Sequence, residues 1–539
     1  SVAIARDGSV AAFVPARRAL SWQLTDAAGV PVVRERLWLT MQPGEVRVCG
    51  SCHGVNTRDQ AQRPAPTHAP QALRDLLTYW QTELEPPVTG TYTRYLAEGV
   101  VSSFFDTRIS LANPGLQSAA TRLDLQRPDG VVVSRTVRVP AMASRTIDAR
   151  TVPGLGDTAF SAVVSSDVPL AVDRTVSWHD SHGNTYGSHA ETGVPAPAPR
   201  WYLAEGATHS GFELFYLLQN PSLRPVDVRV RFLRADAPPI EKTYALGPRS
   251  RTNIWVNQET FGTDGRLLAA ADVSAVLEAI DGTGIIVERA MYLSRAGVTF
   301  LAGHESAGVT APSTRWFLAE GATGNVFDLF LLIANPTEQD ADITVTYLLP
   351  DGAQVRQVRT VGALQRATIW VDRAAPELAA TAVSMVVEST NDVPIVVERS
   401  MWWPGGSQTW TEAHNSPGAT RTGTAWAVAD GEVSGAPLNT ATFYLLANPT
   451  DMPATVNVTL LFADGGGPVT RTLTVVPNSR SNVSVKDEFP EAMGRRFGAL
   501  IESVGADPIP IVVERAMYAD GAGQQRWAVG SNVLATRLR

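Results

Sequence analysis

The feature that most constrains the fold of this chain is a sequence pattern that occurs four times. Each copy opens with a short apolar segment that ends in an acid and a glycine, as in Tyr95-Leu96-Ala97-Glu98-Gly99. The equivalent segments of the other copies are 202–206, 317–321 and 427–431. Each is followed by an apolar run that ends in Asn-Pro, and the four asparagines, Asn113, Asn220, Asn335 and Asn448, are 107, 115 and 113 residues apart. This period is too long for a solenoid repeat and matches an independently folding β-sandwich module.

Each copy closes with an acidic residue followed by arginine in a strand-like segment. The four pairs are Asp173-Arg174, Glu288-Arg289, Glu398-Arg399 and Glu514-Arg515. We expect a buried ion pair between this arginine and the acid of the opening motif, and we favour it over a calcium site in each module. The three histidines in similar positions after this strand, His189, His304 and His414, predict a shared structural hydrogen bond.

The third copy shows the expected secondary structure most clearly. Pro350-Asp351-Gly352 predicts a hairpin turn, and helical periodicity is nearly absent. About seven short strands are predicted, at 316–319, 326–334, 343–347, 354–360, 367–371, 382–388 and 395–402. The sequence therefore predicts a mainly β protein in which four tandem Ig-like antiparallel β-sandwich domains follow one another in a row.

A different kind of sequence precedes the repeats. Residues 10–24 and 32–41 are strand-like and are joined by a turn at 29–31. Pro70 can occupy the first turn of a helix that carries Leu73, Leu76, Trp80 and Leu84 at helical spacing. The predicted domain boundaries are 1–90 for this segment and 91–199, 200–314, 315–424 and 425–539 for the four β-sandwiches.

Within this N-terminal segment, Cys49, Cys52 and His53 form a C-x-x-C-H motif, and the two cysteines are the only ones among 539 residues. This spacing is typical of covalent c-type haem attachment, with two thiols for the porphyrin and an imidazole for the iron. We therefore predict one haem c per chain, held by Cys49 and Cys52, with His53 as the proximal axial ligand. Haem attachment of this kind implies maturation outside the cytoplasm, so we expect an exported protein, located in the periplasm, on the cell surface or outside a bacterial cell.

The distal side of the predicted haem has several candidates. His68 lies on a proline-flanked loop and Met41 on a predicted strand, and either could ligate the iron. A ligand from another chain or an absent upstream region, and an open iron site, are the remaining alternatives. The arginines that could pair with the haem propionates are Arg47, Arg58 and Arg63.

Composition excludes some classes of function. The formal net charge is −8, and no dense run of lysine and arginine occurs, so nucleic acid is not an expected partner. No stretch of about eighteen uninterrupted apolar residues occurs, so no transmembrane segment is expected. The chain opens on Ser1 without a leader, which suggests a processed product or a fragment.

Two resemblances agree with these patterns. The stretch 43–56, with the C-x-x-C-H motif inside it, resembles a monohaem segment of exported bacterial proteins related to the α-subunit of hydrazine synthase. This resemblance implies haem attachment at Cys49 and Cys52 and iron ligation by His53. No second C-x-x-C-H motif occurs, so the further haems and the catalytic machinery of that family do not carry over. The repeats resemble tandem β-sandwich modules of secreted and cell-surface bacterial proteins, for which no catalytic role is transferable.

Three functions follow as hypotheses. The first is an exported electron-transfer or haem-bearing surface protein with a β-sandwich stalk, whose partners are redox proteins. The second is a structural subunit of a filament or surface array, a homopolymer in which the haem is mainly structural. The third is a haem enzyme of the peroxidase or hydrazine synthase type. We find no catalytic residues beyond the haem motif, so we expect no enzyme.

Overall fold

The computed structural model describes residues 2–36, 38–42, 45–47, 70–79, 88, 90–235, 237–295, 297–324, 326–406, 410–521 and 525–539. The chain divides into two compact units, Ser1–Pro87 and Val88–Arg539. The structure is mainly β with antiparallel sheets, which confirms the predicted class. Of the helices described, neither α1 nor α2 has the length and apolar content that a membrane-spanning helix requires.

The described residues of the N-terminal unit form two small antiparallel sheets and one helix. Strand β1 (Ala19–Leu20) pairs with β4 (Leu39–Thr40), and β2 (Gln23–Thr25) pairs with β3 (Pro31–Arg34). The long strands predicted at 10–24 and 32–41 are thus present only as short pieces, because nearly all of these residues are exposed and, among the described residues, no third strand pairs with either sheet.

The helix predicted after Pro70 is confirmed over α1 (Gln71–Tyr79), whereas Trp80 and Leu84 of the same prediction lie outside the described residues. Its first backbone N–H groups have no partner inside the helix and need acceptors from elsewhere. The carboxylate of Asp7 accepts from Gln71 N at 2.8 Å, and the hydroxyl of Ser9 accepts from Ala72 N at 3.0 Å. These two contacts attach the helix to the beginning of the chain.

The second unit contains four modules of the same plan. The first consists of β5 (Tyr92–Leu96), β6 (Val100–Val101), β7 (Phe105–Asn113), β8 (Ala119–Gln126), β9 (Val132–Val139), β10 (Ala143–Asp148), the 3-10 helix η2 (Ala149–Thr151), β11 (Thr158–Ala159), β12 (Ser161–Ser166), β13 (Ala171–His179) and β14 (Thr185–Thr192). The second consists of β15 (Arg200–Leu203), β16 (Phe212–Asn220), β17 (Val226–Arg234), β18 (Ile240–Leu246), β19 (Ser250–Trp255), η3 (Val256–Gln258), η4 (Gly262–Asp264), β20 (Val273–Ala279), β21 (Ile286–Arg295) and β22 (Val298–Ala307).

The other two modules repeat this order. The third consists of β23 (Arg315–Leu318), β24 (Asp328–Ala334), β25 (Ala341–Leu348), β26 (Gln354–Val361), β27 (Arg366–Trp370), η5 (Val371–Arg373), η6 (Pro376–Leu378), β28 (Ser384–Ser389), β29 (Val396–Trp403) and β30 (Glu412–Pro417). The fourth consists of β31 (Ala425–Val428), β32 (Glu432–Val433), β33 (Ala441–Asn448), β34 (Ala454–Phe462), β35 (Val469–Val475), β36 (Ser479–Ser484), α2 (Val485–Glu488), η7 (Pro490–Ala492), β37 (Arg495–Val504), β38 (Val512–Ala519), β39 (Val529–Leu534) and β40 (Thr536–Arg537).

Every module has two antiparallel sheets that enclose one apolar core. In the first module the orders of these sheets are β5-β12-β8-β9 and β10-β7-β13-β14, with β6 and β11 as a separate pair. The second and third modules follow the same order, and the fourth adds β40 beside β31 and β32 beside β37. The core draws on both sheets, for example on Leu123 and Ala162 from one and Leu111 and Val172 from the other. The third module has eight strands in its two sheets where about seven were predicted, because β30 was not anticipated.

The repeated Asn-Pro has a local structural role. Asn113 is fully buried, and its side-chain amide donates to the carbonyls of Gln117, Val139 and Pro140 at 2.7–3.1 Å. The amides of Asn220, Asn335 and Asn448 donate to equivalent carbonyls. The asparagine therefore satisfies backbone acceptors at the turn that follows β7, β16, β24 or β33.

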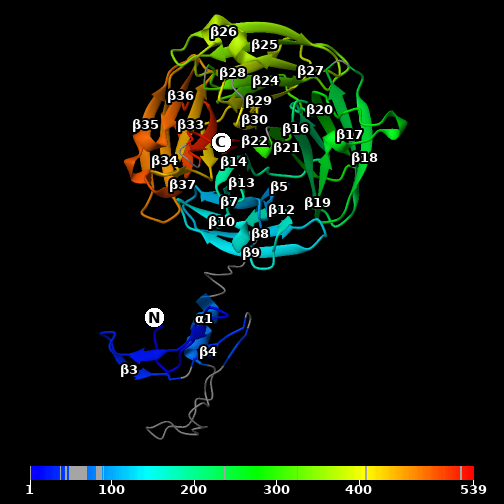
Figure 1. Cartoon of the computed structure of the whole chain (residues 1–539). Helices are drawn as coiled ribbons and strands as arrows, with labels where there is room; N and C mark the ends of the chain where they lie inside the picture. Colours follow the sequence, from blue (N-terminus) through cyan, green and yellow to red (C-terminus); the bar gives the residue numbers. More distant parts are fainter. Residues whose placement is uncertain are drawn as a thin grey trace. The chain divides into compact units, whose positions relative to one another are not determined.

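The four modules close into a ring. One strand of each module, β14, β22, β30 or β39, follows the arginine-bearing strand and lies beside the equivalent strands of both neighbouring modules, including β39 beside β14. We call these four the central strands. Figure 1 shows the modules around a common centre, where labels β14, β22 and β30 lie close together. The predicted row of modules, and with it an extended stalk, is therefore wrong, because the fourth module also packs against the first.

Candidate functional site

The structure describes only two of the residues predicted to surround a haem. Met41 is half-buried, and its backbone carbonyl accepts from Arg17 N at 2.8 Å. Arg47 is exposed and pairs with Glu45 at 2.5 Å. The other predicted site residues, Cys49, Cys52, His53, Arg58, Arg63 and His68, lie outside the described residues. The predicted haem contacts therefore stay predictions.

The repeated motifs meet at the interfaces between modules. We call Glu98, Glu205, Glu320 and Asp430 the loop acids, and Asp173, Glu288, Glu398 and Glu514 the strand carboxylates. The strand carboxylate Glu288 of the second module accepts from the backbone N–H groups of Ala97 and Glu98 of the first, at 2.9 and 2.8 Å. The opening motif of one module is thus the docking point for the closing motif of the next.

The same contact occurs at all four interfaces. Glu398 accepts from Ala204 N and Glu205 N, and Glu514 accepts from Ala319 N and Glu320 N. Asp173 of the first module accepts from Ala429 N at 2.7 Å and Asp430 N at 3.1 Å of the fourth. We name the interfaces 1/2, 2/3, 3/4 and 4/1 after the modules they join. Because 4/1 repeats the contact of the other three, the ring has no open end.

The repeated arginines neutralise these buried carboxylates. Arg174, Arg289 and Arg399 are fully buried and pair with Glu288, Glu398 and Glu514 of the next module at 2.6, 2.6 and 2.8 Å. Arg174 and Arg289 also lie 3.5 and 3.2 Å from the loop acids Glu98 and Glu205, which confirms the predicted ion pair in these two modules. A buried charge is tolerated only when it is paired and hydrogen-bonded, so these contacts fix how neighbouring modules meet.

The three predicted histidines are buried beside the interfaces. Nε2 of His189 lies 3.0 Å from the hydroxyl of Tyr292, and Nε2 of His414 lies 3.0 Å from that of Tyr518. The predicted shared hydrogen bond is thus present in two modules. In the second module, Trp402 takes the place of the tyrosine, and neither ring nitrogen of His304 has a hydrogen-bond partner among the described residues. Burial lowers the pKa of all three histidines well below the usual value, so the rings are neutral.

A single carboxylate serves all four modules at the centre of the ring. Glu412 of β30 accepts from the backbone N–H groups of Ser188, Gly303, Gly530 and Ala413, one from each of the four central strands, at 2.9–3.4 Å. The side chain is fully buried, and burial raises its pKa well above the usual value, although these four N–H groups oppose the shift. The other central strands carry Gly187, Ala302 and Val529 at the equivalent position.

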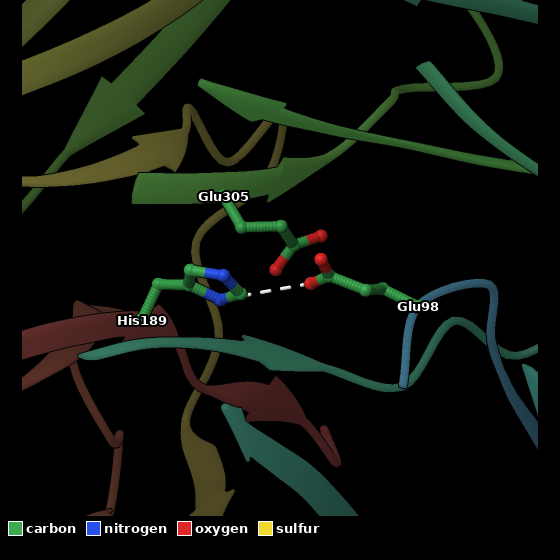
Figure 2. Close-up of side chains that lie close together, drawn as sticks. All are labelled: Glu98, His189 and Glu305. Atoms are coloured by element: carbon green, nitrogen blue, oxygen red, sulfur yellow. Dashed lines mark ion pairs between the residues drawn. The ribbon is translucent and has the colours of Figure 1, made fainter. Parts of the chain in front are cut away.

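One group of side chains at interface 1/2 has the composition of a ligand set. Glu98 of the first module, His189 of β14 and Glu305 of β22 each place one candidate ligand atom within 4.8 Å of the others, and all three are buried. Figure 2 shows the three side chains pointing toward one another, with Nδ1 of His189 3.6 Å from Oε2 of Glu98. Burial raises the pKa of Glu98 and of Glu305, and the charge of Arg174 opposes both shifts.

Comparison with known proteins gives two family matches. The model of a family of unknown function (DUF5719) matches residues 155–486, which is more than half of the chain. The model of the hydrazine synthase alpha subunit middle domain matches residues 1–54, a range that includes Cys49, Cys52 and His53. No curated protein matches the chain.

Solved structures show only distant similarity. Thermotoga maritima 1070 is 21% identical over 20% of this chain and 96% of its own, with a TM-score of 0.19. A tetra-tandem repeat from the extending region of a large adhesion protein is 11% identical over 80% of this chain and 95% of its own, with a TM-score of 0.10. A glycoside hydrolase family 32 protein from Bifidobacterium adolescentis is 10% identical over 83% and 96%, with a TM-score of 0.14.

Sequence reasoning found the repeated acids and arginines but placed their contact inside each module. The strand carboxylates in fact reach the preceding module, and Glu305 and Glu412 were not anticipated at all. The sequence did contain a signal for both acids. Glu412 lies two residues before His414 and Glu305 directly after His304, and the other copies carry different residues at these positions.

Proposed function

Because the chain belongs to a family of unknown function (DUF5719), its role must be argued from its own residues, and we propose that it is an exported, haem-bearing electron-transfer protein. In this proposal four Ig-like β-sandwich modules form a closed ring that acts as a rigid scaffold. The N-terminal segment carries one covalently attached haem c. The protein is not an enzyme, and its partners are redox proteins.

The observation that carries the haem assignment is the C-x-x-C-H motif, which lies inside the match to the hydrazine synthase alpha subunit middle domain. Residues 1–54 match the hydrazine synthase alpha subunit middle domain, and Cys49, Cys52 and His53 fall within this range. A bound haem c would supply a one-electron redox centre there, and the role of the chain is to hold it by two thioethers and one imidazole. His68 and Met41 are the candidate distal ligands, and a thioether ligand would favour a higher potential than a second imidazole.

The cyclic contact of the strand carboxylates supports the scaffold role. Each interface is closed by a buried acid that accepts two backbone N–H groups of the preceding module, and the arrangement is the same at the seam between the last and the first module. Rings closed in this way leave no docking motif of the same kind free for a fifth module. This favours a single particle over the alternative of a filament or surface array built by end-to-end docking of modules.

The test is production of the full chain in a bacterial host with the c-type haem maturation machinery. We expect an intact mass increased by one haem per chain and a low-spin reduced spectrum. The C49S/C52S variant should show neither while keeping the ring fold by circular dichroism. An unmodified wild-type polypeptide under conditions that mature a control cytochrome contradicts the haem assignment.

Carbon monoxide separates electron transfer from catalysis at iron. A six-coordinate haem in the reduced protein should not change its spectrum when the gas is added, whereas binding of the gas would indicate an open iron site and favour the enzymatic alternative. Comparison of H68A with M41A identifies the distal ligand, since only loss of the true ligand makes the reduced haem reactive toward carbon monoxide.

A further inference from the structure

Interface 1/2 differs from its three sister interfaces at one position of the central strand. Glu305, Asn415, Asn532 and Ala190 occupy the same register, each paired with the residue that follows a repeated arginine. At interface 2/3 the amide of Asn415 donates to the loop acid Glu205 at 2.5 Å. At interface 1/2 the equivalent residue is a second carboxylate, so Glu98 receives no side-chain amide there, and both Glu305 and Glu98 contact Arg174 instead.

The buried charges at interface 1/2 are also unbalanced. At 2/3, Glu205 and Glu398 lie among Arg289 and Arg366, and at 3/4, Glu320 and Glu514 lie among Arg399 and Arg480. Each of these interfaces thus has one buried guanidinium for each carboxylate. Interface 1/2 contains the equivalent groups, Glu98, Glu288, Arg174 and Arg251, and in addition Glu305 and Glu191. Full ionisation leaves two negative charges there without a buried positive partner.

Three buried atoms without hydrogen-bond partners belong to the same group of side chains. Among the described residues, Oε2 of Glu98, Nδ1 of His189 and Oε1 of Glu305 accept no hydrogen bond. Buried polar atoms are nearly always satisfied, so unpartnered atoms on three neighbouring side chains indicate a missing partner. The exposed fractions of these residues are 5%, 1% and 1%, so bulk water does not supply that partner.

The histidine is held in the orientation that a metal ligand needs. Nε2 of His189 lies 3.0 Å from the hydroxyl of Tyr292. In the tautomer in which Nε2–H donates to this hydroxyl, the lone pair of Nδ1 is available on the side of Glu98 and Glu305. Metal-binding histidines are typically oriented by a hydrogen bond at their other ring nitrogen. His304 at interface 2/3 lacks such a hydrogen bond because Trp402 replaces the tyrosine.

We propose that a divalent transition-metal ion, of the zinc type, binds at interface 1/2 between Glu98, His189 and Glu305 and joins the first module to the second. Nitrogen and carboxylate oxygen ligands suit zinc and related ions, whereas calcium prefers oxygen ligands alone. The two positive charges of such an ion equal the two negative charges that full ionisation leaves without a buried positive partner at this interface. Arg174 contacts the other oxygen of Glu305 and stays beside the ion as a positioning residue.

The first experiment is metal analysis of the full chain carrying C49S and C52S, so that the C-x-x-C-H thiols cannot bind zinc. Because the site is buried, the metal must enter during folding, and the protein is therefore unfolded, treated with chelator and refolded with or without zinc sulfate. We expect one zinc per chain after dialysis and an increased melting temperature of the zinc-loaded form. Equal melting temperatures and no retained metal would mean that protons alone neutralise the interface, which overturns the proposal.

Variants that copy residues of the sister interfaces separate metal binding from folding. E305N introduces the residue of interface 2/3, and H189S introduces Ser531 of the fourth module, so both substitutions exist in this fold. Each should weaken zinc retention by on the order of 100-fold or more and abolish the difference in melting temperature. The matched control H304A removes the equivalent buried histidine of interface 2/3 and should retain one zinc per chain. Retention of zinc by E305N and H189S, or anomalous scattering that places the ion elsewhere, contradicts the assignment.

Discussion

Interfaces 1/2 and 2/3 use the same backbone contact and differ in how their buried charges are satisfied. At both, a strand carboxylate accepts two N–H groups of the preceding module and pairs with a buried arginine. At 2/3, the amide of Asn415 completes the network, whereas at 1/2 the loop acid faces a second carboxylate. The residues that repeat in every module thus determine how the modules dock. Residues that differ from copy to copy, such as Glu305, give an individual interface its own chemistry.

The largest effect is expected for removal of a strand carboxylate at interface 2/3. Glu398→Ala leaves Arg289 with only Glu205 as a charged partner and leaves two backbone N–H groups without an acceptor. We expect a loss of about 3–5 kcal/mol in the free energy of unfolding, measured by chemical denaturation. Glu288→Ala should cost less, because Arg174 keeps Glu305 and Glu98. Equal losses would show that the extra carboxylate at 1/2 does not support Arg174.

The next effect concerns the centre of the ring, which belongs to no single interface. Glu412→Ala removes the acceptor of four backbone N–H groups, and we expect a loss of about 2–4 kcal/mol in the free energy of unfolding. Glu412→Gln keeps one acceptor oxygen and should lose less. Hydrogen exchange should increase at Ser188, Gly303 and Gly530 together. An increase confined to the third module would contradict the shared role.

Interface 4/1 extends the comparison to pH. Burial raises the pKa of Asp173 from 3.8 to about 6, while Arg515 and the N–H of Ala429 oppose the shift. The folded state therefore binds this proton more tightly than the unfolded state, so the stabilisation is present below pH 3.8 and is lost as the pH rises through about 6. The contribution is on the order of 3 kcal/mol.

The measurement is the free energy of unfolding of wild type and Asp173→Asn between pH 4 and pH 7. The difference between the two proteins should change over this range and stay constant above it. A constant difference throughout would mean that Asp173 has the same pKa in both states.

The smallest effect on stability is expected for replacement of the buried histidines His304 and His414. Both ring nitrogens of His304 lack hydrogen-bond partners among the described residues, whereas His414 bonds to Tyr518 and to Arg399. Replacing an unsatisfied buried polar group by an apolar one of similar size is nearly neutral, so His304→Leu should change the free energy of unfolding by less than about 1 kcal/mol. His414→Leu should cost about 1–2 kcal/mol, because it leaves Tyr518 without its partner. Thermal melts of both variants give the comparison.

The sequence alone was sufficient to predict the strands that pack within a single module. In the third copy every predicted strand is present, because apolar alternation reports burial against a core within the same module. Strand β30 was not predicted because its polar residues, such as Glu412, His414 and Asn415, are buried by neighbouring modules, so it lacks the apolar alternation of a strand buried within its own module. The repeated acids and arginines are visible in the sequence, but the pattern does not say which module each one contacts, so the ring and the group around Glu305 could not be derived. The haem motif, by contrast, is a prediction that rests on sequence alone.

The position of Glu412 has a consequence for how such a ring can be built. Four identical subunits related by a rotation axis would place the same residue near that axis four times, and four carboxylates in so small a volume would repel one another. A single polypeptide can place one acid there and small or apolar residues on the other three strands, as this chain does with Gly187, Ala302 and Val529. Carrying all four modules on one polypeptide therefore allows an arrangement that exact rotational symmetry excludes, in which one side chain accepts from the backbone of every central strand.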